Sequence, residues 1–166
     1  RAAGGEGGWR GRGAEGDGTI YRMTVSAPSP AVAARGSGAS VSILLYSDNA
    51  AVRSLVRDVI GQTIGAQDSP IVWTEVATHQ MAMINCFEHR YDLVLIDNEA
   101  AKLGGVGLVR QMRAELPWQP VVLLLLARQQ DAWLAAWSGA DAALIQPVDP
   151  FGLVSQAAQL MGLPEA

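Results

Sequence analysis

The chain has 166 residues, 49% of them hydrophobic, and a formal net charge of −4 at pH 7. This length gives room for one ordinary domain with a tail, and the apolar fraction is large enough to fill a core. The acidic balance excludes the basic face of a nucleic-acid-binding protein, and the single cysteine, Cys86, excludes an internal disulfide framework. The longest apolar run, 121–127, is too short to span a membrane, and no signal sequence opens the chain, so we expect a cytoplasmic protein.

Residues 1–39 differ in composition from the rest of the chain. Ten of the 18 glycines lie between Gly4 and Gly38, and the apolar residues there follow neither a helical nor a strand period. Such a segment buries too little surface to offset its ordering entropy, so we predict that residues 1–39 are a disordered tail. The folded domain is then expected to comprise residues 40–163, with 164–166 as a short C-terminal end.

From residue 41 onward, apolar segments of two kinds alternate. Short apolar runs predict buried strands, and longer segments with apolar residues at helical spacing predict helices. The predicted strands are 41–46, 71–76, 93–96, 121–126 and 142–145. The predicted helices are 50–60, 78–90, 105–115, 131–138 and 150–161. Thr78 and Asp149 are the expected N-caps, and Gly139 is the expected end of the fourth helix.

The alternation of five strands with five helices favours an α/β fold with a parallel sheet covered by helices on both faces. In such folds, functional residues lie at the carboxyl ends of the strands. In this chain those ends carry Ser47 and Asp48, Asp97, the pair at 126–127, and Gln146.

Asp48 and Asp97 end strands that are neighbours in a doubly wound sheet. Two carboxylates with a loop carbonyl suit a hydrated Mg²⁺ ion, and an aspartate in such a site can attack phosphorus to give an aspartyl phosphate. The alternative is that Asp48 caps the first helix and that Asp97 is a solvated strand end. The spacing alone leaves both interpretations open.

Three segments carry a resemblance to a known family: ILLYSDNAAVRSLVRDVI, YDLVLIDNEAAKLGGVGLVRQMR and SGADAALIQPVDPFGLV. They resemble the receiver domain of bacterial two-component response regulators over residues 41–161. The resemblance places Asp97 at the phospho-accepting aspartate and Gly105 at the glycine that opens the third helix. Pro147 falls on a proline that follows an invariant lysine through a cis bond. The resemblance implies a five-stranded parallel sheet with flavodoxin-like, doubly wound (βα)5 topology and strand order 2-1-3-4-5.

The chain departs from the family's pattern where that pattern binds and senses phosphate. The departures are Ser47 in place of the first carboxylate, Gln146 in place of the lysine, Leu126 and Ala127 in place of the hydroxyl residue, and Ala143 in place of the aromatic switch residue. The single lysine, Lys102, falls in the loop after Asp97 instead.

These departures predict a degenerate receiver. Glutamine gives one neutral hydrogen bond, roughly half as strong as the charge-assisted bond of a lysine. Without the hydroxyl and the aromatic residue, a phosphoryl group gains no differential contacts, so it cannot shift a conformational equilibrium. We therefore expect no enzymatic activity and no required cofactor, with at most weak Mg²⁺ binding at Asp48, Asp97 and the carbonyl of Glu99.

Trp133 and Trp137 lie one helical turn apart on the predicted fourth helix. The resemblance implies that the fourth helix, fifth strand and fifth helix form the surface that contacts partners. Two exposed indoles there are typical of an interface anchor, so we predict that they bind a protein. The alternative is that both indoles fold back onto the core.

The function that these observations favour is a stand-alone interaction module, largely independent of phosphorylation. No output domain is expected after residue 161, so output would pass through protein contacts. One alternative is a working phospho-acceptor that takes phosphate from a histidine kinase at Asp97. Another is an accessory subunit of a large assembly, peripheral on a membrane, since some orphan actinobacterial receivers occur with the respiratory NADH dehydrogenase. The arginine-rich, lysine-poor composition fits a GC-rich actinobacterial genome but specifies no partner.

Overall fold

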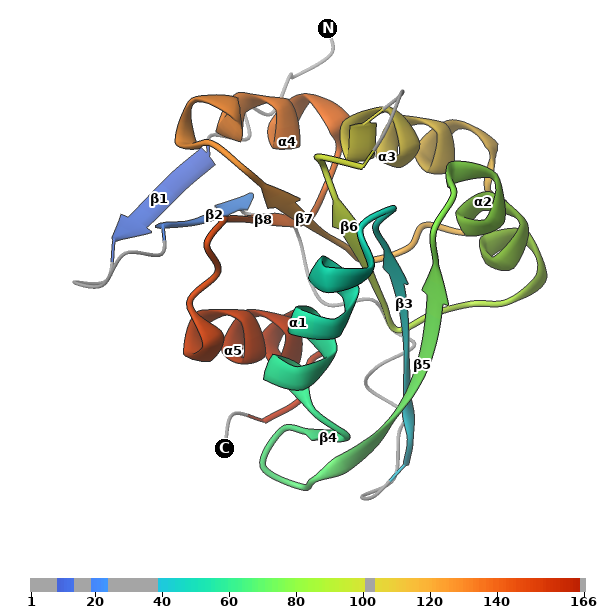
Figure 1. Cartoon of the computed structure of the whole chain (residues 1–166), viewed down its shortest axis with the longest axis vertical. Helices are drawn as coiled ribbons and strands as arrows, with labels where there is room; N and C mark the ends of the chain where they lie inside the picture. The colour runs from blue at the N-terminus through green and yellow to red at the C-terminus, as the bar shows by residue number, and fades with distance from the viewer. Residues whose placement is uncertain (1–8, 14–18, 24–38, 101–103, 165–166) are drawn as a thin grey trace, which may run out of the picture.

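The computed structural model describes residues 9–13, 19–23, 39–100 and 104–164, which form an α/β fold (Figure 1). Five parallel strands make up the centre of the sheet: β3 (Val41–Tyr46), β5 (Ser69–Val76), β6 (Leu93–Asp97), β7 (Val122–Leu126) and β8 (Ala142–Ile145). They lie side by side in the order β5-β3-β6-β7-β8. Numbered within this parallel set alone, the order is 2-1-3-4-5.

Further strands at both edges make the sheet mixed. β1 (Trp9–Gly13) and β2 (Thr19–Met23) pair antiparallel, and residues 20–22 of β2 pair antiparallel with residues 142–144 of β8. At the opposite edge, β4 (Thr63–Ile64) pairs antiparallel with the start of β5. The five predicted strands are present and parallel, but the prediction that they form the whole sheet is wrong, because β1, β2 and β4 pair antiparallel at its edges.

The N-terminal strand pair, β1 with β2, also corrects the prediction that residues 1–39 are disordered. That prediction is wrong for residues 9–13 and 19–23, and residues 1–8, 14–18 and 24–38 lie outside the described part of the chain. The outer edge of β8 would otherwise present unpaired backbone N–H and C=O groups. β2 supplies antiparallel partners for them, and this stabilisation by backbone hydrogen bonds leaves no trace in hydrophobic periodicity.

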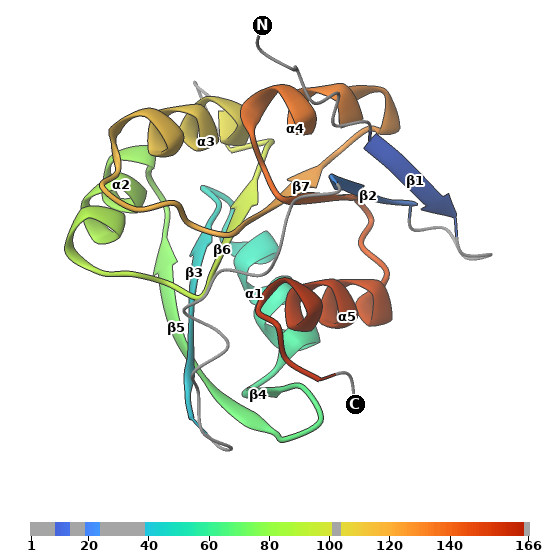
Figure 2. The same cartoon turned by 180° about the vertical axis from the view of Figure 1, so that it is seen from behind.

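Helices cover both faces of the sheet (Figures 1 and 2). One face carries α1 (Ala50–Ile60) and α5 (Pro150–Leu160), which contact each other. The other face carries α2 (His79–Glu88), α3 (Gly104–Glu115) and α4 (Ala132–Ser138). A turn of 3-10 helix, η1 (Gln129–Asp131), leads into α4, so α4 begins one residue later than the predicted helix 131–138. None of the helices in the described ranges is long and apolar enough to cross a membrane.

Alternate side chains of the parallel strands enter two separate cores. On β3, Leu44 and Tyr46 pack with α2, α3 and α4, whereas Ile43 and Leu45 pack with α1 and α5. β6 and β7 alternate in the same way, and all of their residues are buried. Burial on both faces explains why these strands are continuous apolar runs in the sequence.

Capping side chains set the ends of the helices. Thr78 and Asp149 accept hydrogen bonds from backbone N–H groups in the first turns of α2 and α5, which confirms both predicted N-caps. α1 is capped by Asn49, so the alternative that Asp48 caps this helix is wrong. Gly139 ends α4 with a φ of 83°, a left-handed conformation that favours glycine.

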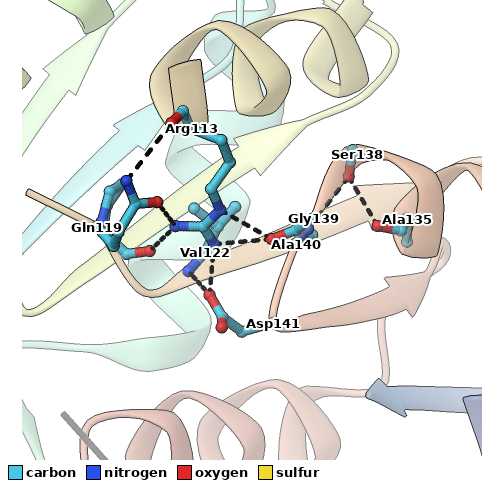
Figure 3. Close-up of polar contacts among 9 residues, drawn as sticks. Arg113, Gln119, Val122, Ala135, Ser138, Gly139, Ala140 and Asp141 are labelled. Carbon is cyan, nitrogen blue, oxygen red and sulfur yellow. Dashed lines mark hydrogen bonds and ion pairs between the residues drawn. The ribbon is translucent and has the colours of Figure 1, made fainter. Parts of the chain in front are cut away.

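Arg113, in the last turn of α3, ties this helix to the segments that lead into β7 and β8 (Figure 3). Its guanidinium donates to the carbonyl oxygen of Gly139 from two nitrogens, at 2.9 and 2.8 Å, and to the carbonyl oxygen of Pro120 at 2.7 Å. It also forms an ion pair with Asp141 at 2.9 Å. Asp141 in turn accepts the backbone N–H of Val122 at 2.7 Å. This network fixes where both strands begin.

Candidate functional site

The carboxyl ends of three strands bring Ser47, Asp97 and Gln146 together. Ser47 follows β3, Asp97 is the last residue of β6, and Gln146 follows β8. Asp97 is only 2% exposed and Ser47 is fully buried, whereas Gln146 is half-buried. The alternative interpretation of Asp97 as a solvated strand end is therefore wrong.

Both oxygens of the Asp97 carboxylate accept hydrogen bonds from neutral groups. Oδ2 accepts the hydroxyl of Ser47 at 2.7 Å. Oδ1 accepts the backbone N–H of Glu99 at 3.0 Å and the side-chain amide of Gln146 at 3.3 Å. Among the described residues, Asp97 forms no ion pair, so three neutral donors surround its charge.

The Ser47 hydroxyl is aimed at Asp97 by its own surroundings. Its oxygen accepts the backbone N–H of Asn49 at 3.1 Å, which leaves its proton for the carboxylate. The carbonyl oxygen of Ser47 accepts a bond from the Arg53 guanidinium at 2.6 Å, and Arg53 forms an ion pair with Glu75 at 3.3 Å. Arg53 thus connects the loop between β3 and α1 to β5.

α3 begins against the end of β6, and Gly105 permits this close approach. A Cβ atom at this position would lie 2.6 Å from Cγ2 of Ile96 and 2.9 Å from the carbonyl oxygen of Asp97. Asn98 completes the junction, because its side chain accepts the backbone N–H of Val106 at 3.1 Å. The glycine expected from the resemblance therefore has a steric reason in this chain.

The positions that sense phosphate in the family carry no side-chain hydrogen-bond donor here. Leu126 and Ala143 are fully buried, and Ala127 is half-buried. The carbonyl oxygen of Leu126 accepts the backbone N–H of Gln146 at 2.7 Å, which joins the ends of β7 and β8. The peptide bond between Gln146 and Pro147 is cis, in agreement with the resemblance. Lys102 lies outside the described residues.

The family's magnesium ion would need oxygen donors at the ends of β3 and β6. Asp48 is exposed, while both oxygens of Asp97 already accept hydrogen bonds and the backbone N–H of Glu99 supplies one of them. Within the described ranges, no group of three or more His, Cys, Asp and Glu side chains is arranged to hold a metal ion. The weak magnesium site predicted at Asp48, Asp97 and the carbonyl of Glu99 therefore stays a prediction.

Tyr46, the last residue of β3, is buried beside the site. Burial raises the pKa of its phenol, and the negative charges of Asp48 and Asp97 raise it further. The phenol therefore remains neutral at physiological pH and adds no charge to the surroundings of Asp97.

The two tryptophans of α4 do not fold back onto the core. Trp133 is 64% exposed and Trp137 is 55% exposed, so the alternative that both indoles are buried is wrong. Arg110 of α3 stacks on one of them, with its guanidinium carbon 4.0 Å from the centroid of the Trp137 ring. The role of these indoles in an interface stays a prediction.

Sequence reasoning identified Ser47 and Gln146 as departures from the family but not as partners of Asp97. A signal was present, because a hydroxyl and an amide can both donate to a carboxylate. Arg110 was missed entirely. Its contact depends on how α3 packs beside α4, which the spacing of residues within one helix does not reveal.

Known proteins resemble the chain in sequence over most of its length. Two response regulatory proteins, from two strains of Mycobacterium tuberculosis, are each 36% identical to it over 128 residues. The alignment covers 77% of this chain and 96% of each relative. No protein-family model matches the chain.

Solved structures share the fold. The receiver domain of a Francisella response regulator matches with a TM-score of 0.63 and 18% identity, over 74% of this chain and 98% of that domain. A chemotaxis protein of Vibrio cholerae matches with a TM-score of 0.60 and 18% identity, over 74% of this chain and 99% of that protein. At this level of identity the likeness concerns the fold alone.

Proposed function

The chain belongs to the response regulators, with the fold of their receiver domains, and from this premise we propose that it is a degenerate receiver. In this proposal it is a protein-interaction module that contacts partners in the cytoplasm largely without phosphorylation. Its Asp97 serves as the buried acceptor at the centre of a network of neutral hydrogen-bond donors. The alternative in the same family is a receiver that takes a phosphoryl group from a histidine kinase at Asp97.

The observation that carries the proposal is the surroundings of the Asp97 carboxylate. To attack phosphorus, a carboxylate oxygen must be free, and the negative charge of the incoming phosphoryl group must be neutralised. Here Oδ2 accepts the Ser47 hydroxyl at 2.7 Å and Oδ1 accepts the Gln146 amide at 3.3 Å. A neutral amide supplies no net positive charge to a phosphoryl oxygen. Both substitutions therefore favour the resting carboxylate over an acyl phosphate.

The second support is the absence of a side chain that could respond to phosphate at the family's sensing positions. Leu126 and Ala143 are packed in the core and cannot donate a hydrogen bond. A phosphoryl group on Asp97 would gain the same contacts before and after any movement of α4, so it could not favour one conformation. The conformation that binds the partner is then the resting one.

Exposure to acetyl phosphate and Mg²⁺, followed by intact mass spectrometry, tests this proposal. In a working receiver, a carboxylate oxygen of Asp97 forms the new bond to phosphorus, the bond from phosphorus to the acetate oxygen breaks, and acetate leaves. We expect no phosphoryl adduct on the wild-type chain, as on the Asp97→Asn control. A double variant, Ser47→Asp with Gln146→Lys, supplies the missing carboxylate and cation and should gain the adduct. A stoichiometric adduct on the wild-type chain would overturn the proposal.

A further inference from the structure

α3 and α4 lie side by side on one face of the sheet (Figures 1 and 2). The exposed surface of α4 carries two tryptophans. Trp133 and Trp137 of α4 are one helical turn apart and are 64% and 55% exposed. We call these two side chains, with Arg110 of α3, the indole ridge. Together the two indoles expose roughly 250–300 Å² of largely apolar surface, which approaches the size of the largest patch on a typical monomer.

Arg110 is held in place on this ridge by two contacts. Its guanidinium carbon lies 4.0 Å from the centroid of the Trp137 ring, well inside the range of a cation–π contact. One terminal nitrogen also donates to the carbonyl oxygen of Trp137 at 3.0 Å. The side chain is nevertheless exposed, so its remaining N–H donors face solvent in a fixed orientation.

Three carboxylates, one on α3 and two on the segments that flank α4, are engaged with other groups. Each accepts a hydrogen bond from a different side chain: Asp131 from Arg128, Asp141 from Arg113, and Glu115 from Gln111. Arg110 forms no ion pair with any described residue. The ridge therefore presents a positive charge that is stacked on Trp137 and has no ion-pair partner among the described residues, on a chain whose net charge is −4.

The adjoining edge of the sheet is closed by the chain itself. Residues 20–22 of β2 pair with residues 142–144 of β8, so β8 itself cannot accept a strand from another protein while the N-terminal strand pair is in place, and β1 is the outermost described strand on this side. The ridge, by contrast, is covered by none of the described segments.

The size and the charge of the indole ridge both indicate which kind of partner fits it. A standard interface buries about 800 Å² on each partner, which is well above the area of the two indoles, so the ridge is better matched to a short segment. A second copy centred on the ridge by a two-fold axis would also bring its own Arg110 against this one. A carboxylate, in contrast, can accept two parallel bonds from a stacked guanidinium.

We propose that the indole ridge binds an acidic amphipathic helix of a protein partner. This inference rests on the interaction function proposed above and names the chemistry of its partner. Apolar side chains of the helix pack on Trp133 and Trp137, and a carboxylate at the rim of its apolar face pairs with Arg110.

The test uses two labelled helical peptides of about 15 residues with the same leucine stripe, flanked by glutamate in one and by lysine in the other. Fluorescence anisotropy gives their affinities for the full chain. We expect the glutamate peptide to bind at least about tenfold more tightly, and Arg110→Glu to reverse this preference. Arg90→Glu is the matched control, because Arg90 is also exposed and lies over another indole, with its guanidinium carbon 6.0 Å from the Trp118 centroid.

Three outcomes of this experiment support or overturn the inference. Loss of binding in Trp133→Ala, together with reversal of preference in Arg110→Glu alone, supports the inference. Equal affinity for both peptides, or an equal effect of Arg90→Glu, overturns it and leaves the proposed function standing. Binding of the glutamate peptide only after addition of beryllofluoride and Mg²⁺ supports the ridge as the docking site but overturns the independence from phosphorylation.

Discussion

Substitution of Ser47 by alanine tests whether the network around Asp97 is a structural centre. The change removes the hydroxyl that donates to Oδ2 of Asp97 at 2.7 Å, in a place where Ser47 is fully buried and Asp97 is 2% exposed. A hydrogen bond to a charged group contributes about 1.5–3 kcal/mol, because its loss leaves a charged oxygen without a partner. We therefore expect Ser47→Ala to lower the free energy of unfolding by about 2 kcal/mol.

Ser42 provides a matched control at the other end of β3. Its hydroxyl also donates to an aspartate, Oδ2 of Asp92, at 3.0 Å. That oxygen keeps the backbone N–H of Ser42 at 2.7 Å when the hydroxyl is removed, and Ser42 is only half-buried. Ser42→Ala should therefore lower the free energy of unfolding by less than about 1 kcal/mol.

Urea unfolding of the single and double variants measures the interaction itself. Ser47→Ala also removes the acceptor of the Asn49 backbone N–H, so the single variant reports more than one bond. A double-mutant cycle with Asp97→Ala isolates the term between the two side chains, and we expect a coupling of about 1.5–3 kcal/mol. A coupling below about 0.5 kcal/mol, or an equal effect of Ser42→Ala, would refute this account of the site.

Three further predictions concern other parts of the fold. Gly105→Ala should destabilise the chain by about 1–2 kcal/mol in urea unfolding, because its Cβ would meet the carbonyl oxygen of Asp97 at 2.9 Å. The cost of this clash exceeds the gain in helix propensity from alanine. A stabilised variant would show that α3 does not approach β6 so closely. Arg113→Ala should cost about 2–3 kcal/mol in the same assay, since Asp141 loses its ion pair and the Gly139 carbonyl loses its side-chain donor. An unchanged midpoint would contradict this. Burial raises the pKa of the Cys86 thiol to about 12, so the native thiol should resist alkylation near pH 8 and react after unfolding. Because unfolding returns this pKa toward 9.0, the unfolded state loses the proton first, and the free energy of unfolding should fall between pH 9 and about 12 more steeply than in Cys86→Ala.

The central sheet and its helices could be predicted because their signals are local. Strands buried on both faces are continuous apolar runs. Thr78 and Asp149 begin helices, and Gly139 ends one, through contacts within a few residues. The choice of Asn49 over Asp48 as the cap of α1 was not predictable from composition, because both side chains can cap a helix and only the backbone geometry decides.

What could not be predicted depends on contacts between distant segments. β2 joins β8 through backbone hydrogen bonds, which place no requirement on a hydrophobic period. The replacement of a carboxylate and a lysine by Ser47 and Gln146 was visible in the sequence, but their bonds to Asp97 join residues about fifty positions apart. The contact of Arg110 with Trp137 likewise depends on the packing of α3 beside α4.

The amide spectrum of the chain with and without beryllofluoride and Mg²⁺ tests the central claim most directly. Beryllofluoride mimics a phosphoryl group on an aspartate and would report both binding at Asp97 and any response of α4. The account predicts that the amide resonances of Gly105, of α4 and of β8 stay unchanged, as they do in Asp97→Asn. Saturable shifts at Asp97 that extend to Trp133 and Trp137 would contradict it and identify a working phospho-acceptor.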